Sequence, residues 1–219
     1  MRLVFQQELH DVQDRLVESA ELVVSAITRA SEAFRTSNVS LAEQVIADDE
    51  KLDQLTVALD ELAINILARQ QPVARDLRIV VSALRISASL ERMGDIAAHI
   101  AQLARFRFPE KVVPRELRPT FDEMAAHDIE VARQVVELLR TTDPRLADSI
   151  RAEDDRLDEL HHSVFERVLG EDWDQDAAVT VDTTLASRYH ERFGDHAVSI
   201  AKKVLYLATG DWVPETIDD

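Results

Sequence analysis

Cysteine is absent from this sequence of 219 residues, which excludes disulfide bonds, thiolate metal sites and a cysteine nucleophile. Long apolar runs are absent as well, because no stretch approaches the roughly 18 uncharged residues of a membrane-spanning helix. The opening residues, MRLVFQQELHD, contain no apolar segment of the signal-peptide kind. We therefore expect a protein of a reducing compartment and assign it to the cytoplasm.

Positive charge is scarce, with 25 Lys and Arg against 42 Asp and Glu and a net charge of −17. A nucleic-acid-binding surface needs clustered basic residues, so the composition argues against that class of partner. The balance suits a soluble protein that meets basic partners or bound cations.

Helix-breaking residues are few, with 4 glycines and 6 prolines, while apolar residues make up 46% of the chain. Helix formers therefore dominate, and the prolines separate long stretches in which apolar residues recur every three or four positions. Asp143 followed by Pro144 has the spacing of a helix N-cap. We predict an all-α fold with six helices, over residues 2–36, 39–70, 73–107, 116–141, 144–169 and 174–209.

One short motif occurs twice. Residues 90–95 read LERMGD and residues 190–195 read HERFGD, and seven of the eleven residues from Glu91 to Ala101 recur one hundred positions later. Residues 36–55 match residues 141–160 at an offset of 105. The sequence therefore predicts two copies of a three-helix unit. We place these copies at residues 1–110 and 115–212, followed by a tail at residues 213–219.

Each copy carries two acidic pairs spaced four residues apart, which puts each pair on one helix face. Asp53 and Glu91 both lie 19 residues from Pro72, near the turn between their helices. Antiparallel helices rise equally per residue, so the two pairs of each copy should meet side by side. The eight residues are Asp49, Asp53, Glu91, Asp95, Asp154, Asp158, Glu191 and Asp195.

Four like charges at one level repel one another, so a positive group should compensate them. Arg92 and Arg192 are adjacent in sequence but are expected to point about 100° away. A site built from carboxylates, in a chain without cysteine, suits hard metal ions that prefer oxygen ligands. Gly94 and Gly194 each cost a helix roughly 1 kcal/mol and leave room for a neighbouring helix or a bound group. The other interpretation is that the carboxylates form salt bridges, such as Glu91 with an arginine of another helix.

Other chemistry has little support in the sequence. A single Glu-x-x-His motif at Glu159 falls short of the two that a ferritin-like di-iron site needs. We expect His127, His190 and His196 on the surface or behind a site, not as metal ligands. Nucleophile elbows and glycine-rich phosphate loops are not found in the sequence. A hydrolase that uses clustered metal ions is conceivable, although no nucleophile is evident.

The two motif copies, each preceded by an Asp-x-x-x-Asp helix, resemble the PhoU family of phosphate-signalling proteins, in particular its actinobacterial, PhoY-like branch. The segments QQPVARDLR at 70–78 and YLATGDW at 206–212 extend the resemblance over nearly the whole chain. It implies two three-helix bundles related by a pseudo-twofold axis. It also implies multinuclear metal binding by the eight carboxylates, with iron, zinc, manganese or magnesium as the ion.

The resemblance further implies a regulatory adaptor and not an enzyme. The adaptor would restrain phosphate uptake and the phosphate-starvation response by contacting the ATPase subunit of a phosphate ABC transporter and a phosphate-sensing histidine kinase. It would reach the membrane only through these partners, and we expect a homodimer. The alternative is a helical bundle that stores metal or hydrolyses a substrate with it.

The turns between the second and third helices of the two copies differ most. The first turn carries Arg69, Arg75 and Arg78, whereas the second is acidic over residues 171–176. Acidic residues also favour a helix N-terminus, so the charges could simply be solvated. The competing prediction is that the basic turn docks on an acidic patch of the kinase or transporter ATPase, with salt-dependent association.

Overall fold

Polar caps determine where several of the helices begin. Asn38 accepts a hydrogen bond from the Leu41 amide at 3.1 Å, Asp143 from Arg145 at 3.0 Å and Asp176 from Val179 at 2.8 Å. Each cap satisfies an amide that the first helical turn leaves without an intrahelical partner. The predicted start of the last helix at residue 174 is three residues early, because Asp176 is the capping residue.

The computed structural model describes residues 2–210, and within that range it confirms the all-α prediction. The six long helices agree with the predicted ranges to within about three residues, as expected for helix ends. They are α1 (Arg2–Thr36), α2 (Val39–Gln70), α3 (Ala74–Arg107), α4 (Arg118–Thr141), α5 (Pro144–Val168) and α6 (Ala177–Thr209), with a short 3-10 turn η1 (Arg115–Leu117) before α4.

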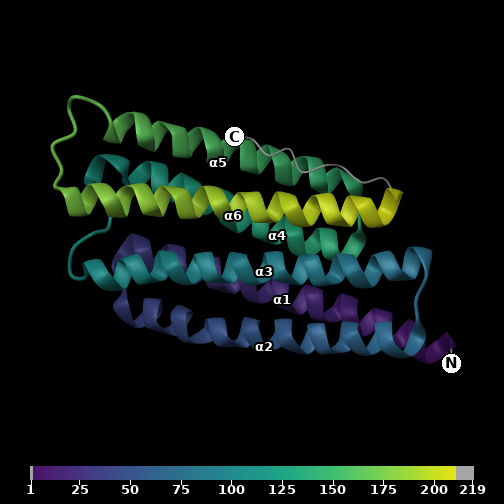
Figure 1. The fold of residues 1–219 in the computed structure, drawn as a ribbon. Coiled ribbons are helices and arrows are strands. Elements are labelled where there is room, and N and C mark those ends of the chain that lie inside the picture. Colours follow the sequence, from purple (N-terminus) through teal and green to yellow (C-terminus); the bar gives the residue numbers. More distant parts are fainter. Residues whose placement is uncertain (1, 211–219) are drawn as a thin grey trace.

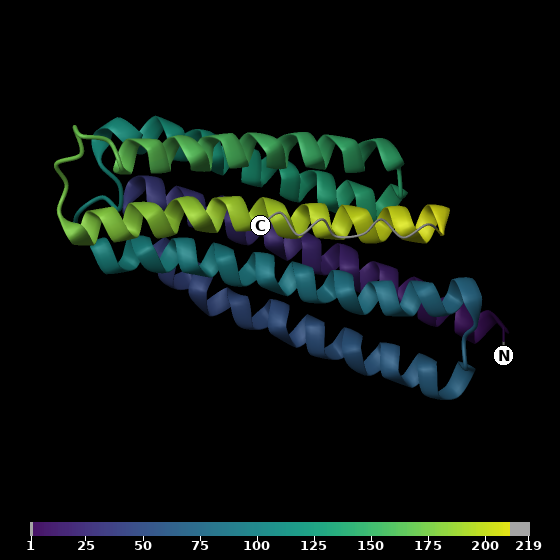
Figure 2. The same cartoon turned by 45° about the horizontal axis from the view of Figure 1, so that its top comes forward.

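The six helices form two three-helix units that pack along one another. Figure 1 shows α2, α3, α6 and α5 side by side in one layer with α1 and α4 behind them, and Figure 2 shows the same order from another side. Helix α3 contacts α1 and α2 of its own unit and also α6, while α1 contacts α4. The central position of α3 and α6 explains why both are buried along most of their length, including Leu90, Met93 and Phe193.

Helices α3 and α6 pack against each other and run in opposite directions (Figure 1). His99, five residues after Gly94, stacks on Tyr189, five residues before Gly194, with ring centroids 5.3 Å apart. Further along the same seam Arg107 forms an ion pair with Asp182. The two copies of the repeated motif therefore lie level with each other at the middle of the molecule.

The described helices are not of a kind that crosses a bilayer. None within residues 2–210 combines the length and the apolar character that a membrane span needs. The predicted tail at residues 213–219 lies outside the described residues. The unit boundaries at 110, 115 and 212 stay predictions.

Candidate metal centres

The repeated glycines allow the acidic helices to approach each other closely. A methyl group on Gly94 would lie 3.0 Å from Asp49 Oδ1 and would overlap Leu52 of α2. A methyl group on Gly194 would lie 2.9 Å from Leu157 Cδ1 and would overlap the Asp154 carboxylate of α5. The clearance expected beside each glycine is therefore filled by the neighbouring helix. Each glycine thus allows an Asp-x-x-x-Asp pair of α2 or α5 to pack directly against the repeated Glu-Arg-x-Gly-Asp motif of α3 or α6.

The second acidic cluster, formed by Asp154 and Asp158 on α5 with Glu191 and Asp195 on α6, has two buried and two exposed carboxylates. Asp154 and Glu191 expose only 9% and 8% of their surface. Burial raises the pKa of Asp154 to about 7, with the charges of Asp158, Asp195, Asp155 and then Glu191 contributing further. Burial also raises the pKa of Glu191 to about 7, reinforced by Asp195 and opposed by Arg188. The four carboxylates therefore interact across the α5–α6 seam.

The first acidic cluster, formed by Asp49 and Asp53 on α2 with Glu91 and Asp95 on α3, has the same arrangement. Burial raises the pKa of Asp49 to about 6, and the next contributions come from the charges of Asp95, Asp53 and Glu91. Asp53 is exposed, whereas Glu91 and Asp95 are half-buried. The structure thus brings the predicted residues together in both halves, at the same level of the molecule.

Two arginines reach these clusters that the sequence analysis did not place there. Arg92 Nη1 donates to Asp95 Oδ2 at 3.0 Å, so the expectation that Arg92 points away from the carboxylates is wrong. Arg188 forms an ion pair with Glu191, and Ala88 stands at the equivalent position of the first copy. Both pairs are three residues apart on one helix, a spacing that could have predicted them. One oxygen of Glu191 and one of Asp95 are therefore in salt bridges, but these form within one helix and not with an arginine of another helix, as the alternative had suggested for Glu91.

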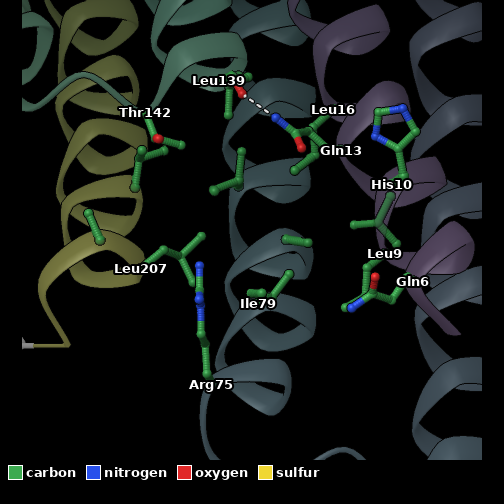
Figure 3. Close-up of a pocket in the computed structure, with 15 residues that line it drawn as sticks. Gln6, Leu9, His10, Gln13, Leu16, Arg75, Ile79, Leu139, Thr142 and Leu207 are labelled. Atoms are coloured by element: carbon green, nitrogen blue, oxygen red, sulfur yellow. Dashed lines mark hydrogen bonds between the residues drawn. The ribbon is translucent and has the colours of Figure 1, made fainter. Parts of the chain in front are cut away.

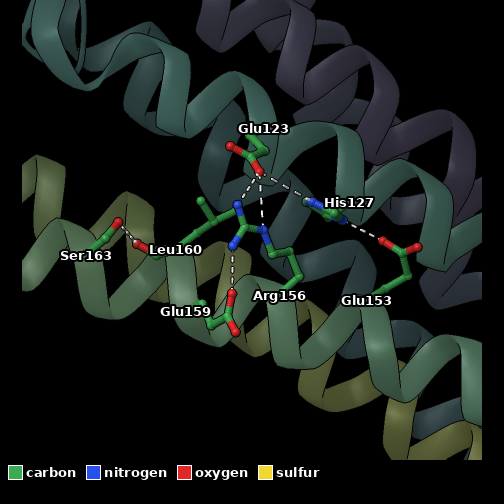
Figure 4. Close-up of polar contacts among 7 residues, drawn as sticks. All are labelled: Glu123, His127, Glu153, Arg156, Glu159, Leu160 and Ser163. Atoms are coloured by element: carbon green, nitrogen blue, oxygen red, sulfur yellow. Dashed lines mark hydrogen bonds and ion pairs between the residues drawn. The ribbon is translucent and has the colours of Figure 1, made fainter.

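Three other carboxylates, on the side where α5 packs against α4, each contact a basic side chain. Arg156 donates to Glu123 at 2.8 Å and to Glu159 at 2.6 Å, and His127 Nδ1 lies 2.5 Å from Glu153 Oε2 (Figure 4). These three carboxylates therefore have basic partners within the α4–α5 seam. In the second acidic cluster, by contrast, the buried oxygens Asp154 Oδ1 on α5 and Glu191 Oε2 on α6 have no hydrogen-bond partner among the described residues.

The donor set of the two clusters fits a hard cation in chemistry. All eight side chains offer only oxygen, the ligand that magnesium and manganese prefer. A cavity of about 410 Å³ lies beside Asp154, Asp158 and Asp195, and one of about 230 Å³ lies beside Asp49. In the part of the chain that the structure describes, no three His, Asp or Glu side chains lie together in an arrangement that could hold a metal ion. Binding would require the carboxylates to turn toward a shared ion.

His190 has a different role from the one expected. It is 1% exposed, and its Nδ1 lies 2.6 Å from Asp128 Oδ2 on α4, which is fully buried. Phe34 and Phe121 pack edge-on against the imidazole ring. The prediction of a surface or second-layer histidine is therefore wrong for His190, which belongs to the core between α4 and α6.

The three arginines of the first turn are spread over different environments. Arg69 is exposed in the last turn of α2, and Arg75 is exposed at one end of a largely apolar cavity of about 410 Å³ between α1, α3, α4 and α6 (Figure 3). Arg78 is half-buried, and its guanidinium lies 5.9 Å from the Tyr206 ring of α6. The charge of this end of the molecule is therefore carried outward mainly by Arg69 and Arg75.

Comparison with known proteins gives the same twofold division as the helices. A family model described as the PhoU domain matches residues 16–104 and, a second time, residues 121–204. The chain belongs to the PhoU family. The family predicted from the repeated motif is thereby confirmed.

The relatives of this PhoU-family chain match it over nearly its full length. The Mycobacterium tuberculosis protein named phosphate-specific transport system accessory protein PhoU homolog 2 is 40% identical over 210 residues, which cover 96% of this chain and 99% of that protein. PhoU homolog 1 of Mycobacterium leprae is 39% identical over 212 residues, covering 97% and 96%.

Two solved PhoU structures have the same fold. Pseudomonas aeruginosa PhoU has a TM-score of 0.88 at 29% identity and covers 94% of this chain and 100% of that one. The regulatory protein PhoU of Streptococcus pneumoniae has a TM-score of 0.86 at 25% identity, with coverage of 96% and 99%. These names describe accessory and regulatory proteins, and the family is not enzymatic.

Proposed function

We propose that this protein is a cytoplasmic regulatory adaptor of phosphate uptake. It restrains a phosphate ABC transporter and the phosphate-starvation response by contacting the transporter ATPase and a phosphate-sensing histidine kinase, and it acts as a homodimer. Support comes from full-length relatives named as accessory proteins of phosphate-specific transport. Its connection with the membrane is indirect, through these partners.

The adaptor holds metal ions at the two acidic clusters. The observation that carries this part of the proposal is the buried Asp154 Oδ1, which has no hydrogen-bond partner among the described residues although four further carboxylates interact with Asp154. A buried carboxylate oxygen without a donor is costly, and a bound cation would remove that cost. Iron, zinc, manganese and magnesium are the candidate ions, and oxygen-only donors favour magnesium or manganese.

Metal content tests this part of the proposal. Protein purified without an affinity tag should contain metal at both clusters, whereas the Glu91→Gln/Glu191→Gln variant should lose it because an amide is a much weaker ligand. That variant should also unfold at a higher temperature than chelator-treated wild type, since two repelling charges are gone. The measurements are elemental analysis and thermal melting.

If the double variant melted well below the chelator-treated wild type, the glutamates would instead be acting through salt bridges. The ion pair of Glu191 with Arg188 makes this a real alternative at that residue. Glu91 has no arginine at the matching position, where Ala88 stands. The two single variants, Glu91→Gln and Glu191→Gln, therefore separate the two causes.

The basic turn docks on an acidic surface of the kinase or the transporter ATPase. The proposal of Arg69, Arg75 and Arg78 as partner-binding residues is supported by the exposure of Arg69 and Arg75 in a chain of net charge −17. Charge steering of this kind raises the association rate at low salt and weakens as salt screens it.

Reversing the charges of the basic turn should weaken association by about tenfold or more at low salt, with a smaller effect at high salt. The variant is Arg69→Glu/Arg75→Glu. Arg78 is left unchanged because it packs on Tyr206. Arg115→Glu/Arg118→Glu is the matched control, because both arginines are exposed elsewhere and the charge change is equal. Affinity for both partners that equals wild type in surface plasmon resonance would exclude the turn as a docking site.

A further inference from the structure

The cavities beside the two acidic clusters differ in their cations. The cavity of the second half is lined by Arg151, Arg192 and Lys202 as well as by its carboxylates. In the first half, isoleucine and glutamine (Ile46 and Gln102) stand where the second half has Arg151 and Lys202. The repeated halves thus share their acidic residues, while two of the three cations belong to the second half alone.

The cations of the first cavity are already engaged. Arg29 Nη1 and Lys51 Nζ each lie 2.7 Å from an oxygen of Asp48, so one carboxylate holds both. In the second cavity Arg151 makes only a long contact of 3.6 Å with Asp148. Over residues 2–210, Arg192 and Lys202 form no ion pair. Positive groups therefore remain available in the second half and not in the first.

A serine adds a hydroxyl donor to the same cavity. Ser199 lines the cavity, and its Oγ accepts a hydrogen bond of 2.5 Å from Lys203 Nζ. A hydroxyl that accepts from an ammonium group keeps its own hydrogen to donate. His99 stands at the matching position of the first half. The second cavity thus combines arginine, lysine and hydroxyl donors, the groups that bind tetrahedral oxyanions.

Charge explains why such an anion would depend on a metal ion. The lining holds three cations against Asp154, Asp155, Asp158 and Asp195, so it carries a net charge of about −1 and repels anions. One divalent ion at the carboxylates changes the balance to about +1. An anion can then contact both the ion and the cations, as phosphate does at many cation sites.

We propose that the cavity of the second half binds a tetrahedral phosphoryl oxyanion once a metal ion occupies the second acidic cluster, and that the first half does not. This inference rests on the proposed metal binding and adds a ligand to it. The anion is either free orthophosphate or a phosphoryl group carried by a nucleotide. Arg192, Lys202 and Ser199 hold it, and the buried Asp154 is a ligand of the metal ion beneath it.

Equilibrium dialysis of inorganic phosphate against Mn²⁺-saturated protein tests the inference. Wild type should bind phosphate with Mn²⁺ and lose this binding after chelation. Arg192→Ala/Lys202→Gln should weaken phosphate binding by about tenfold or more, because two charge-assisted contacts are lost. The matched control is Arg92→Ala/Gln102→Ala, the same positions of the first half, which should bind phosphate like wild type.

Binding of Mn²⁺ itself is measured separately by electron paramagnetic resonance on the same proteins. If Mn²⁺ does not bind wild type, both the metal proposal and this inference are overturned. If Mn²⁺ binds and neither phosphate nor ATP follows, or if both double variants behave alike, only this inference is overturned. Parallel dialysis with ATP decides between free and nucleotide-borne phosphate as the ligand.

Discussion

Replacing His190 with leucine, the residue at the matching position of the first half, is expected to lower the free energy of unfolding by about 3–5 kcal/mol. The change removes the only hydrogen-bond partner of the Asp128 side chain among the described residues. Burial already raises the pKa of Asp128 to about 6, and the neighbouring His190 opposes that rise. Urea denaturation at neutral pH would show the loss as a lower midpoint with an unchanged slope.

A second substitution separates the polar pair from the space that it fills. The variant His190→Leu/Asp128→Ala replaces both partners with apolar side chains of similar total volume. Replacing a whole buried pair is often neutral, so this variant should recover most of the lost stability. If the free energy of unfolding of His190→Leu lies within about 1 kcal/mol of the wild-type value, the pair contributes little to the packing of α4 on α6.

Metal-free protein is expected to melt about 5 °C higher at pH 5.5 than at pH 8. The pKa values of Asp49, Asp154 and Glu191 are raised to between about 6 and 7, above their ordinary values near 4. The folded state therefore binds protons that the unfolded state has lost. This stabilisation is complete below about pH 4 and is lost as the pH rises through 6 and 7.

Two histidines act in the opposite direction. Burial lowers the pKa of His161 and His196, so the unfolded state binds protons at these residues more readily than the folded state does. Their contribution to the free energy of unfolding is therefore lost as the pH falls below 6.5. Solvent screening also reduces the carboxylate effect, and for both reasons we expect only a modest change in melting temperature. Thermal melting of chelator-treated protein across this pH window measures it. The Asp154→Asn/Glu191→Gln variant should show a flatter profile, and an equal pH dependence in both proteins would contradict the electrostatic account.

The internal repeat and the helix periodicity were enough to predict the six helices and the two acidic clusters. Prolines and caps located the helix ends, and the equal distance of Asp53 and Glu91 from Pro72 brought their helices into the correct register. These features depend on local sequence and on constant helical rise, so they can be read without a structure. The i, i+3 arginine contacts of Arg92 and Arg188 were equally local and could have been predicted.

The buried pair of His190 and Asp128 could not be predicted in this way. It depends on how α4 is aligned along α6. Because α4 has little sequence similarity to α1, this alignment could not be inferred from the first copy of the repeat. The identity of His190 gives no indication of burial, because histidine is common both in cores and on surfaces. The difference in cations between the two cavities was likewise visible only once Arg192 and Lys202 were seen to line the same space.

The most direct test of the account is the melting temperature of chelator-treated protein as Mn²⁺ is added at pH 7.5. Metal binding at the acidic clusters predicts a rise with Mn²⁺ concentration, because an ion that binds only the folded state stabilises it. It also predicts that Asp49→Asn/Asp154→Asn melts above chelator-treated wild type and no longer responds to Mn²⁺. If the melting temperature of wild type stayed unchanged at saturating Mn²⁺, the acidic clusters would not be metal centres.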